Sequence, residues 1–598
     1  MSTTTATVRG GAWLIEDAAA ESIFTREKLS EEHRLIGQTA DEFITNEVQP
    51  SIQRLEQKDW AHARQLVRRA GELGLLGADV PDDLGGVGLD KASAIIVGEA
   101  VGRVASFATT FGAQTGLAIT PLLCFGTEAQ KAKYVPRLVS GELVGAYALS
   151  ESGSGSDALG ARARAARQPD GSFVLNGEKM WITNGGFADV FIVFAQVEAA
   201  GAAAGVGKGE FTAFIVERGF PGVSSGNEEH KMGLFGSSTT PLILQDAKIP
   251  ADCVLGEIGK GHKVAFNVLN YGRFKLGAMC SGGARAVVGE AARYAVQRRQ
   301  FGQSIATFGA IRHKLAEMTI REFAVESMLY RTAGLIDQAL QGSHANDAVL
   351  GALEEYAIEA SILKVAGSEM TDFVVDENVQ IHGGNGFVRD YPAERHYRDA
   401  RVNRIFEGTN EINRLLIPGM LIRRALKGGL PLLPAAKKLQ DEILNPSMPE
   451  PVGEAPLESE RRAVAAMKKV ALMVLGTAMQ TYGTKLTDEQ EVQSMSADIL
   501  IDVFAAESVL LRATACSADL PAGRDADLYG AAARVCISDA ASRVEIAART
   551  ALAAMADGDT LRTLLAALRR ILKVAPVNTV ALRRQIADAI IARKAYPF

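Results

Sequence analysis

The sequence predicts a mainly helical α+β protein with an N-terminal helical domain, a central β domain, a C-terminal helical bundle and one more helical domain. Three observations support this prediction. Alanine-rich stretches with a 3.6-residue period fill residues 30–143 and return after residue 256. Short β-prone runs separated by prolines lie between them. A proline cluster in 427–456 then sets off the last helical stretch, 457–598.

Length and composition limit the class of protein. A chain of 598 residues is too long for one compact core, so several domains are expected. Hydrophobic residues make up 47% and charged residues 22%, as in ordinary globular proteins. A net charge of −6 without a long basic stripe argues against a nucleic-acid partner. The five cysteines stand alone, so neither a metal knuckle nor a disulfide framework is expected.

The N-terminal residues 1–29 are expected to form an extension before the first domain. They lack the basic segment and apolar run of a secretory signal. No apolar run approaches the length of about 18 residues that a membrane span needs, and Val470–Met479 is too short. We therefore expect a cytoplasmic protein.

The β domain is expected at residues 144–255. The sequence Asn176-Gly177 between two of its β-prone runs predicts a hairpin turn there. The predicted strands are Val144–Leu149, Phe173–Leu175, Lys179–Thr183, Val190–Gln196, Phe211–Val216 and Leu242–Asp246.

A helical bundle is expected at residues 256–426. The chain has no proline between Pro250 and Pro392, which predicts long helices there. Residues 427–456 are interpreted as a linker because prolines recur along them. In 457–598, a leucine stripe with basic neighbours suits either a core-facing helix or a membrane surface, and we favour the core. The stripe contains Leu561, Leu564, Leu565, Leu568 and Leu572.

The first candidate ligand site is the Gly/Ser-rich loop after the first predicted strand, Tyr147–Asp157. Such a loop offers backbone N–H groups and hydroxyls to a ligand, with no Cβ to block close approach. It nearly matches a dinucleotide-binding fingerprint, which requires a helix opening at the glycines. A hairpin is expected next instead, so we reject that interpretation; a simple surface loop is the alternative.

Three further segments suggest a site. Trp181 beside Thr183 could place a flat apolar wall and a hydroxyl against a planar ligand. The glycines in Gln380–Phe387 leave more bare backbone at a helix end than a cap needs. Glu407, next to Ile405 and Phe406, could be desolvated and so become a general base. A core tryptophan, an interhelix turn and a solvated glutamate are the alternatives.

Together these segments resemble the acyl-CoA dehydrogenase family over residues 30–425. One family pattern is matched by Ala148-Leu149-Ser150-Glu151-x-x-Ser154-Gly155-Ser156-Asp157-x-x-Gly160. The other is matched by Gln380-x-x-Gly383-Gly384-x-Gly386-Phe387-x-x-Asp390-x₄-Arg395-x₃-Asp399. The extra C-terminal domain resembles the very-long-chain branch of that family.

The resemblance implies FAD as cofactor. The β-domain loop would line the flavin, Trp181 would stand over the ring, Arg298 would meet the pyrophosphate, and the 380–384 segment would approach an FAD held mainly by a neighbouring subunit. The implied cofactor residues are Tyr147, Leu149, Ser150, Gly155, Ser156, Trp181, Ile182, Thr183, Arg298, Gln300, Phe301, Phe308, Gln380, His382, Gly383, Gly384, Thr409 and Glu411.

For the thioester substrate, the resemblance implies contacts from Ser156, Asn270, Arg273 and Gly408. Many members have an acid where Asn270 stands, so this contact loses its charge here. Glu407 would remove the α proton while the β hydrogen leaves as hydride to the flavin. A minority of the family carries the base just before the arginine, and that position is Gly272 here.

The resemblance further implies a long-chain acyl-CoA substrate, electron-transferring flavoprotein as electron acceptor, and a homodimer. Peripheral membrane contact is a secondary interpretation of the last domain. Two alternatives remain: an acyl-CoA oxidase that passes electrons to oxygen, and a non-catalytic scaffold on the same fold.

Overall fold

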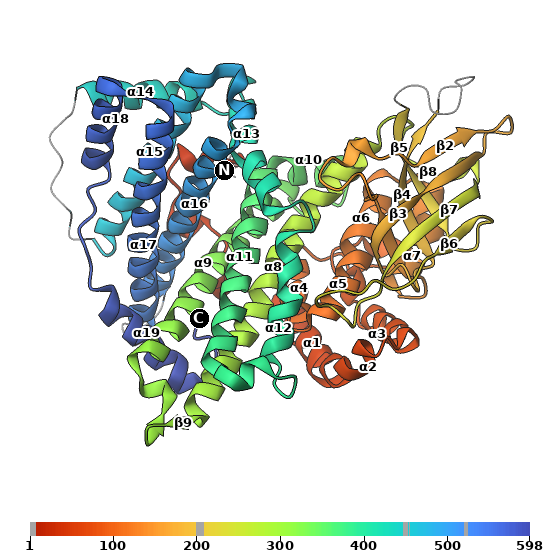
Figure 1. Cartoon of the computed structure of the whole chain (residues 1–598), viewed down its shortest axis with the longest axis horizontal. Helices are drawn as coiled ribbons and strands as arrows, with labels where there is room; N and C mark the ends of the chain where they lie inside the picture. The colour runs from red at the N-terminus through yellow and green to blue at the C-terminus, as the bar shows by residue number, and fades with distance from the viewer. Residues whose placement is uncertain (1–7, 199–208, 446–452, 454, 520–523) are drawn as a thin grey trace, which may run out of the picture.

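The computed structural model describes residues 8–198, 209–445, 453, 455–519 and 524–598. In Figure 1 the sheet lies at one end of the molecule and the C-terminal helices at the other, with the long central helices between them. Two hydrophobic cores hold this arrangement. One joins the N-terminal helices to the sheet, and the other joins the central bundle to the C-terminal domain.

The N-terminal helices precede the sheet and pack against it. Their polar starts follow the sequence: Ser30 and Thr127 both form capping boxes with the residue three positions on. The helices are α1 (Glu31–Phe43), α2 (Ile52–Glu56), α3 (Trp60–Glu72), α4 (Lys91–Gly102), α5 (Ala105–Gly112), α6 (Thr120–Phe125) and α7 (Glu128–Val139).

The sheet has the strand order β6–β7–β3–β2–β4–β5–β8, and β1 pairs in parallel with β4. Strand β4 is buried almost throughout because both of its faces are covered. The strands are β1 (Gly145–Ala148), β2 (Arg164–Arg167), β3 (Phe173–Thr183), β4 (Val190–Val197), β5 (Glu210–Glu217), β6 (Val223–Ser225), β7 (Thr239–Ile249) and β8 (Val254–Leu255).

The hairpin turn predicted at Asn176-Gly177 is wrong. Strand β3 continues through this point, and the register against β7 shifts between Leu175 and Gly177, as in a bulge. The φ of Gly177 is 149°, and an added Cβ would lie 2.8 Å from the Cβ of Ala163. The turn lies earlier, between β2 and β3, where Gly171 has a φ of 85°.

The central bundle carries the long proline-free helices. In Figure 1 α8 and α11 run side by side through the middle of the molecule, and a short hairpin of β9 (Arg299–Gln300) and β10 (Gln303–Ser304) follows α8. The helices are α8 (Gly261–Gln297), α9 (Gly309–Leu340), α10 (Asn346–Glu355), α11 (Ala357–His382), α12 (Ala393–Ala400) and α13 (Asn410–Leu426).

The predicted linker 427–456 contains a helix, α14 (Leu432–Leu444), so that interpretation is wrong over those residues. Pro431 precedes the helix and Pro434 lies in its first turn, where backbone N–H groups need no helical partner. The clustered prolines of residues 427–456 therefore include two at the start of a helix, Pro431 and Pro434. Residues 446–452 and 454 lie outside the described residues.

The last domain packs on the central bundle, as the core-facing interpretation of the leucine stripe predicts. Leu568 and Leu572 are buried, and the other three leucines pack against the same core. The helices are α15 (Glu458–Tyr482), α16 (Gln490–Asp519), α17 (Arg524–Met555), α18 (Gly558–Ile571) and α19 (Thr579–Arg593).

One stretch of the described chain, Glu458–Asp488, is long and apolar enough to cross a membrane by length and composition alone, contrary to the expectation that no run qualifies. The stretch includes charged residues such as Lys468 and Lys469, so it is not a strictly apolar run. Of its most apolar window, 56% is buried inside the protein.

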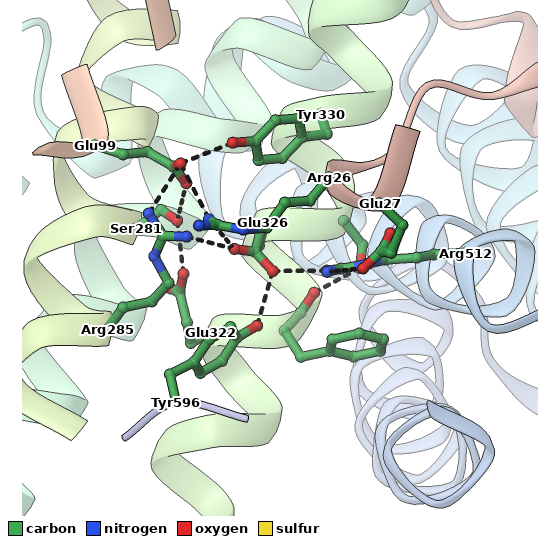
Figure 2. Close-up of polar contacts among 12 residues, drawn as sticks. Arg26, Glu27, Glu99, Ser281, Arg285, Glu322, Glu326, Tyr330, Arg512 and Tyr596 are labelled. Carbon is green, nitrogen blue, oxygen red and sulfur yellow. Dashed lines mark hydrogen bonds and ion pairs between the residues drawn. The ribbon is translucent and has the colours of Figure 1, made fainter. Parts of the chain in front are cut away.

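A buried charge network ties the N-terminal extension and the last domain to the bundle (Figure 2). The carboxylate of Glu326 on α9 pairs with Arg26 at 2.9 Å, Arg285 at 2.9 Å and Arg512 at 2.8 Å. The Tyr596 hydroxyl donates to the same carboxylate at 2.9 Å. Removing one member of a buried ion pair costs about 3–5 kcal/mol, so these segments behave as one unit with the bundle.

Candidate active site

Glu407 lies in the loop between α12 and α13, beside an apolar cavity. Its φ is 58°, a left-handed conformation that is uncommon for residues other than glycine. The side-chain Oε2 is buried and has no hydrogen-bond partner among the described residues. An unpartnered buried carboxylate oxygen is costly, and its place beside a cavity fits a ligand that would meet it.

Burial raises the pKa of Glu407 to about 7, while the positive charges of Arg273 and then Lys364 oppose that rise. The predicted desolvation is therefore present, although its source differs in part from the expectation. The Ile405 side chain is 52% exposed and shields nothing, whereas Phe406 lines the same cavity as Glu407. A pKa near neutrality suits a general base.

Gly272 on α8 faces the carboxylate directly. A Cβ added there would lie 2.7 Å from Oε2 of Glu407 and 2.9 Å from its Cδ. The two positions that resemble alternative base positions in the family thus converge on one place. Because Gly272 has no side chain, the Glu407 carboxylate occupies the space next to it.

The cavity beside Glu407 runs between α8 and the helical segment around α5. Small and apolar residues dominate the two walls, including Ala108, Gly112, Gly116, Leu276, Met279 and Gly283. A lining of this kind accepts a flexible hydrocarbon chain.

Three of the predicted substrate residues meet next to the base. Arg273 is 6% exposed; its Nη1 donates to the Asn270 Oδ1 at 3.0 Å and its Nε donates to the Glu407 carbonyl at 3.2 Å. Gly408 has a φ of 80°, and an added Cβ would lie 3.5 Å from Nη2 of Arg273. The fourth, Ser156, lies exposed in the β-domain loop, with no bond to Arg273.

The Gly/Ser loop is anchored by a buried ion pair that the sequence analysis did not single out. Nζ of Lys179, wholly buried in β3, lies 2.6 Å from the Glu151 carboxylate. Glu151 also accepts the backbone N–H groups of Arg162 and Ala163. These contacts fix both ends of the loop, while Cβ atoms added at Gly153 and Gly155 would meet nothing within 4 Å.

Trp181 stands next to this loop at a second register shift of β3, between Lys179 and Ile182. Its φ is 58°, and its side chain is 55% exposed although Ile182 beside it is buried. Thr183 at the end of the strand lines the Glu407 cavity. The bulge thus turns the tryptophan outward next to the cavity wall.

These features fit the flavin that the resemblance implies. The Tyr147 hydroxyl is buried without a partner, and burial together with Glu407 raises the pKa of Tyr147 well above its ordinary value. Main-chain Ser150 O accepts from Met180 N at 2.9 Å, and Leu149 is buried beneath the loop. An exposed aromatic face, open loop glycines and an orphaned hydroxyl suit a planar, polar-edged ligand.

The remaining predicted cofactor residues lie elsewhere in the subunit. The hairpin that carries Arg298–Phe301 projects from the far end of α8, away from the sheet (Figure 1), and Phe301 is 92% exposed. Phe308 contacts Phe301 edge-on. Cβ atoms added at Gly383 and Gly384 would also meet open space. His382 stacks on Tyr294 with ring centroids 3.9 Å apart, which places both segments together.

The start of α13 holds the last two predicted residues. Thr409 is the N-cap, and its Oγ1 accepts from Ile412 N at 3.2 Å. Glu411 lies in the first turn, where its own backbone N–H and the Thr409 hydroxyl lower its pKa. Lys364 on α11 reaches the same turn through Asn410, and the sequence analysis did not predict it as a site residue. A lysine inside an apolar helical run, Ile362-Leu363-Lys364-Val365, was the available signal.

Comparison with known proteins identifies the family. Models of the N-terminal, middle and C-terminal domains of acyl-CoA dehydrogenases match residues 30–142, 146–247 and 259–421. A further model, also described as an acyl-CoA dehydrogenase C-terminal domain, matches 466–570.

Similar proteins cover the whole chain. The "Probable acyl-CoA dehydrogenase" of Bacillus subtilis (strain 168) is 46% identical over 596 residues, 98% of each protein. The mitochondrial "Very long-chain specific acyl-CoA dehydrogenase" of Homo sapiens is 37% identical over 468 residues, 74% of this chain and 68% of that protein. The crystal structure of an acyl-CoA dehydrogenase complexed with FAD from Bacillus anthracis shares 46% identity, covers 99% of this chain and 100% of that one, and has a TM-score of 0.95. The chain therefore belongs to the acyl-CoA dehydrogenase family and is an FAD-dependent enzyme of that family.

Proposed function

We propose that the enzyme converts a long-chain saturated acyl-CoA to the 2-enoyl-CoA, with Glu407 removing the α proton. The observation that carries this proposal is the buried carboxylate of Glu407, with a pKa of about 7 and an unpartnered Oε2, in the wall of an apolar cavity. The base must be ionised to act. Its activity is therefore fully present above the pKa and lost as the pH falls through about 7.

The residues around Glu407 divide the remaining tasks. The Arg273 guanidinium, held by Asn270 and the Glu407 carbonyl, presents positive charge where the polar part of the thioester would enter. The small residues of the cavity leave room for the acyl chain and exclude water from the reacting carbons. Bound FAD supplies the acceptor for the β hydrogen, and Trp181 and Thr183 would hold its ring beside the cavity.

The proposed long-chain preference predicts a steep dependence on acyl length. We expect kcat/KM for palmitoyl-CoA to exceed that for butyryl-CoA by at least about 10-fold, since each buried methylene contributes about 0.8 kcal/mol. The measurement is initial rate against saturated acyl-CoAs of graded length with a dye acceptor. Higher efficiency on butyryl-CoA would contradict the proposal.

A substitution at Gly112 in the cavity wall tests the same preference, because it narrows the cavity and leaves Glu407 unchanged. A Cβ added at Gly112 would lie 3.2 Å from Cε of Met279 in the cavity wall. Gly112→Val should therefore reduce turnover of palmitoyl-CoA more than that of butyryl-CoA. Equal loss on both substrates would indicate a general packing defect instead.

We also propose a homodimer in which each FAD contacts both subunits. The hairpin that carries Arg298–Phe301 projects away from the sheet (Figure 1), and Cβ atoms added at Gly383 and Gly384 would meet nothing within 4 Å. One subunit therefore does not assemble the whole site.

Electron-transferring flavoprotein is the proposed electron acceptor. A structural relative at 34% identity and a TM-score of 0.59 is described as "Electron transferring flavoprotein of Acidaminococcus fermentans".

The dimer proposal predicts that Arg298→Ala weakens FAD binding by about 10-fold or more, because a charge-assisted contact to a phosphate is lost. FAD retained after dialysis and mass from light scattering are the readouts. Arg293→Ala is the control, since Arg293 is exposed on the same helix and bonds only the Lys594 carbonyl. A stable monomer that carries a full complement of FAD would refute the shared site.

A further inference from the structure

Lys364 is a wholly buried lysine in the middle of α11, behind the base. Its Nζ donates to the Asn410 Oδ1 at 2.6 Å. Among the described residues no carboxylate forms an ion pair with it. Burying an ammonium without a paired anion costs several kcal/mol, so the fold keeps this lysine against a clear penalty.

Asn410 connects this lysine to the base loop. It is the first residue of α13, three positions after Glu407, and is 2% exposed. Its Nδ2 donates to Ser368 Oγ at 3.1 Å and to Glu369 Oε1 at 3.0 Å, both on α11. These bonds use both ends of the amide, so the start of α13 is fixed to α11.

The base loop is fixed from its other side by Asn413. Nδ2 of Asn413 donates to the Gly408 carbonyl at 2.8 Å and to the Thr409 carbonyl at 3.1 Å. Arg273 holds the Glu407 carbonyl from α8. Lys364, Asn413 and Arg273 thus contact residues 407–410 from three helices, α11, α13 and α8.

The charges around Glu407 come from three elements. Arg273 on α8 and Lys364 on α11 are the cations, and the Tyr147 phenol faces it from β1. Lys364 in turn faces Cys280, Glu407, Arg273 and Glu411. Burial lowers the pKa of Lys364 to about 8, which leaves it mostly charged at pH 7. Arg273 belongs to the predicted substrate contacts, whereas Lys364 does not line the cavity.

We propose that Lys364 is a positioning residue for the base: its buried ammonium anchors the start of α13 through Asn410, three residues after Glu407, and its charge favours the ionised form of Glu407. This inference rests on the proposed role of Glu407. It assigns to Lys364 two separable effects, one geometric through Asn410 and one electrostatic on the carboxylate.

Two substitutions separate these effects in the FAD-loaded enzyme. Lys364→Met removes both the charge and the hydrogen bond, while Lys364→Gln removes the charge and keeps an N–H donor that is one bond shorter in reach than Nζ. We expect both to move the acidic limb of the kcat/KM pH profile upward by about one unit from its position near 7, since a nearby opposite charge shifts a carboxyl pKa by roughly that amount. FAD content should stay at the wild-type level.

The matched control is Lys468→Met. Lys468 is also a buried helical lysine, but it pairs with Glu507 of the last domain at 2.5 Å and with Asp17 of the N-terminal extension at 3.2 Å. Its removal should leave the acidic limb in place. If Lys364→Met does not retain FAD, the Gln variant alone decides the electrostatic effect.

Two results would overturn the inference. An acidic limb that stays at its wild-type pH in Lys364→Gln, with or without loss of turnover, would reduce Lys364 to a structural role. Activity that survives Glu407→Gln with an unchanged limb would overturn the proposed base, and this inference with it. The first result leaves the proposed function intact, so the two failures are distinguishable.

Discussion

Glu407→Gln is expected to bind FAD normally and to lose turnover by at least about 10²–10⁴-fold, the usual contribution of a positioned base. The amide keeps the size of the side chain, and the cavity beside it stays the same. It cannot accept the α proton, and no other carboxylate lines that cavity among the described residues. The measurement is steady-state turnover of a saturated acyl-CoA by protein with a verified flavin content.

Glu442→Gln provides the control for this substitution. Glu442 lies on α14, does not line the cavity and pairs with Lys469 at 2.6 Å near the surface. Its replacement should change turnover by far less than that of Glu407. If Glu407→Gln turned over substrate at a rate near that of the wild type, the base would have to be elsewhere.

Gly272→Ala is expected to lower turnover by about 10²-fold, because displacing a reacting group by about 1 Å has consequences of that size. The new methyl group would lie 2.7 Å from Oε2 of Glu407, closer than any real contact. The carboxylate is at the end of a flexible side chain, so it would move and the fold would survive. The base would then no longer stand at the α carbon.

Gly289→Ala on the same helix separates this effect from the general cost of changing a helical glycine. A Cβ there would lie 3.0 Å from the end of the Arg293 side chain, which can move aside, and in ordinary contact with the Lys594 carbonyl at 3.6 Å and the Ala595 Cα at 3.7 Å. Gly→Ala inside a helix contributes roughly 0.5–1 kcal/mol of stability. Gly289→Ala should therefore keep its activity, and similar turnover in both variants would contradict the account of Gly272.

The sequence predicts the site better than it predicts the local course of the chain. Glu407, Arg273 and Gly272 are brought together as expected because a family pattern constrains spacing and residue type together. Asn176-Gly177 suits a hairpin turn equally well as a bulge, and only pairing with β7 decides between them. Pro434 likewise suits both a linker and the first turn of a helix.

Lys364 shows what sequence alone cannot provide. A lysine in a helix is usually solvated, and the apolar run around Lys364 indicates that it is buried without indicating its partner. Its significance arises from Asn410, forty-six positions away along the chain, which contacts it only in the folded protein. The same holds for Glu326, whose arginine partners come from the N-terminal extension, α8 and α16.

The most direct test of the central claim is anaerobic reduction of the bound flavin by a saturated long-chain acyl-CoA, followed by the loss of flavin absorbance. We predict that palmitoyl-CoA bleaches the wild-type flavin and forms the 2-enoyl-CoA. Glu407→Gln, with the same flavin content, should bleach more slowly by at least about 10²-fold. A wild-type flavin that palmitoyl-CoA leaves oxidised, or equal bleaching rates in the two proteins, would contradict the account.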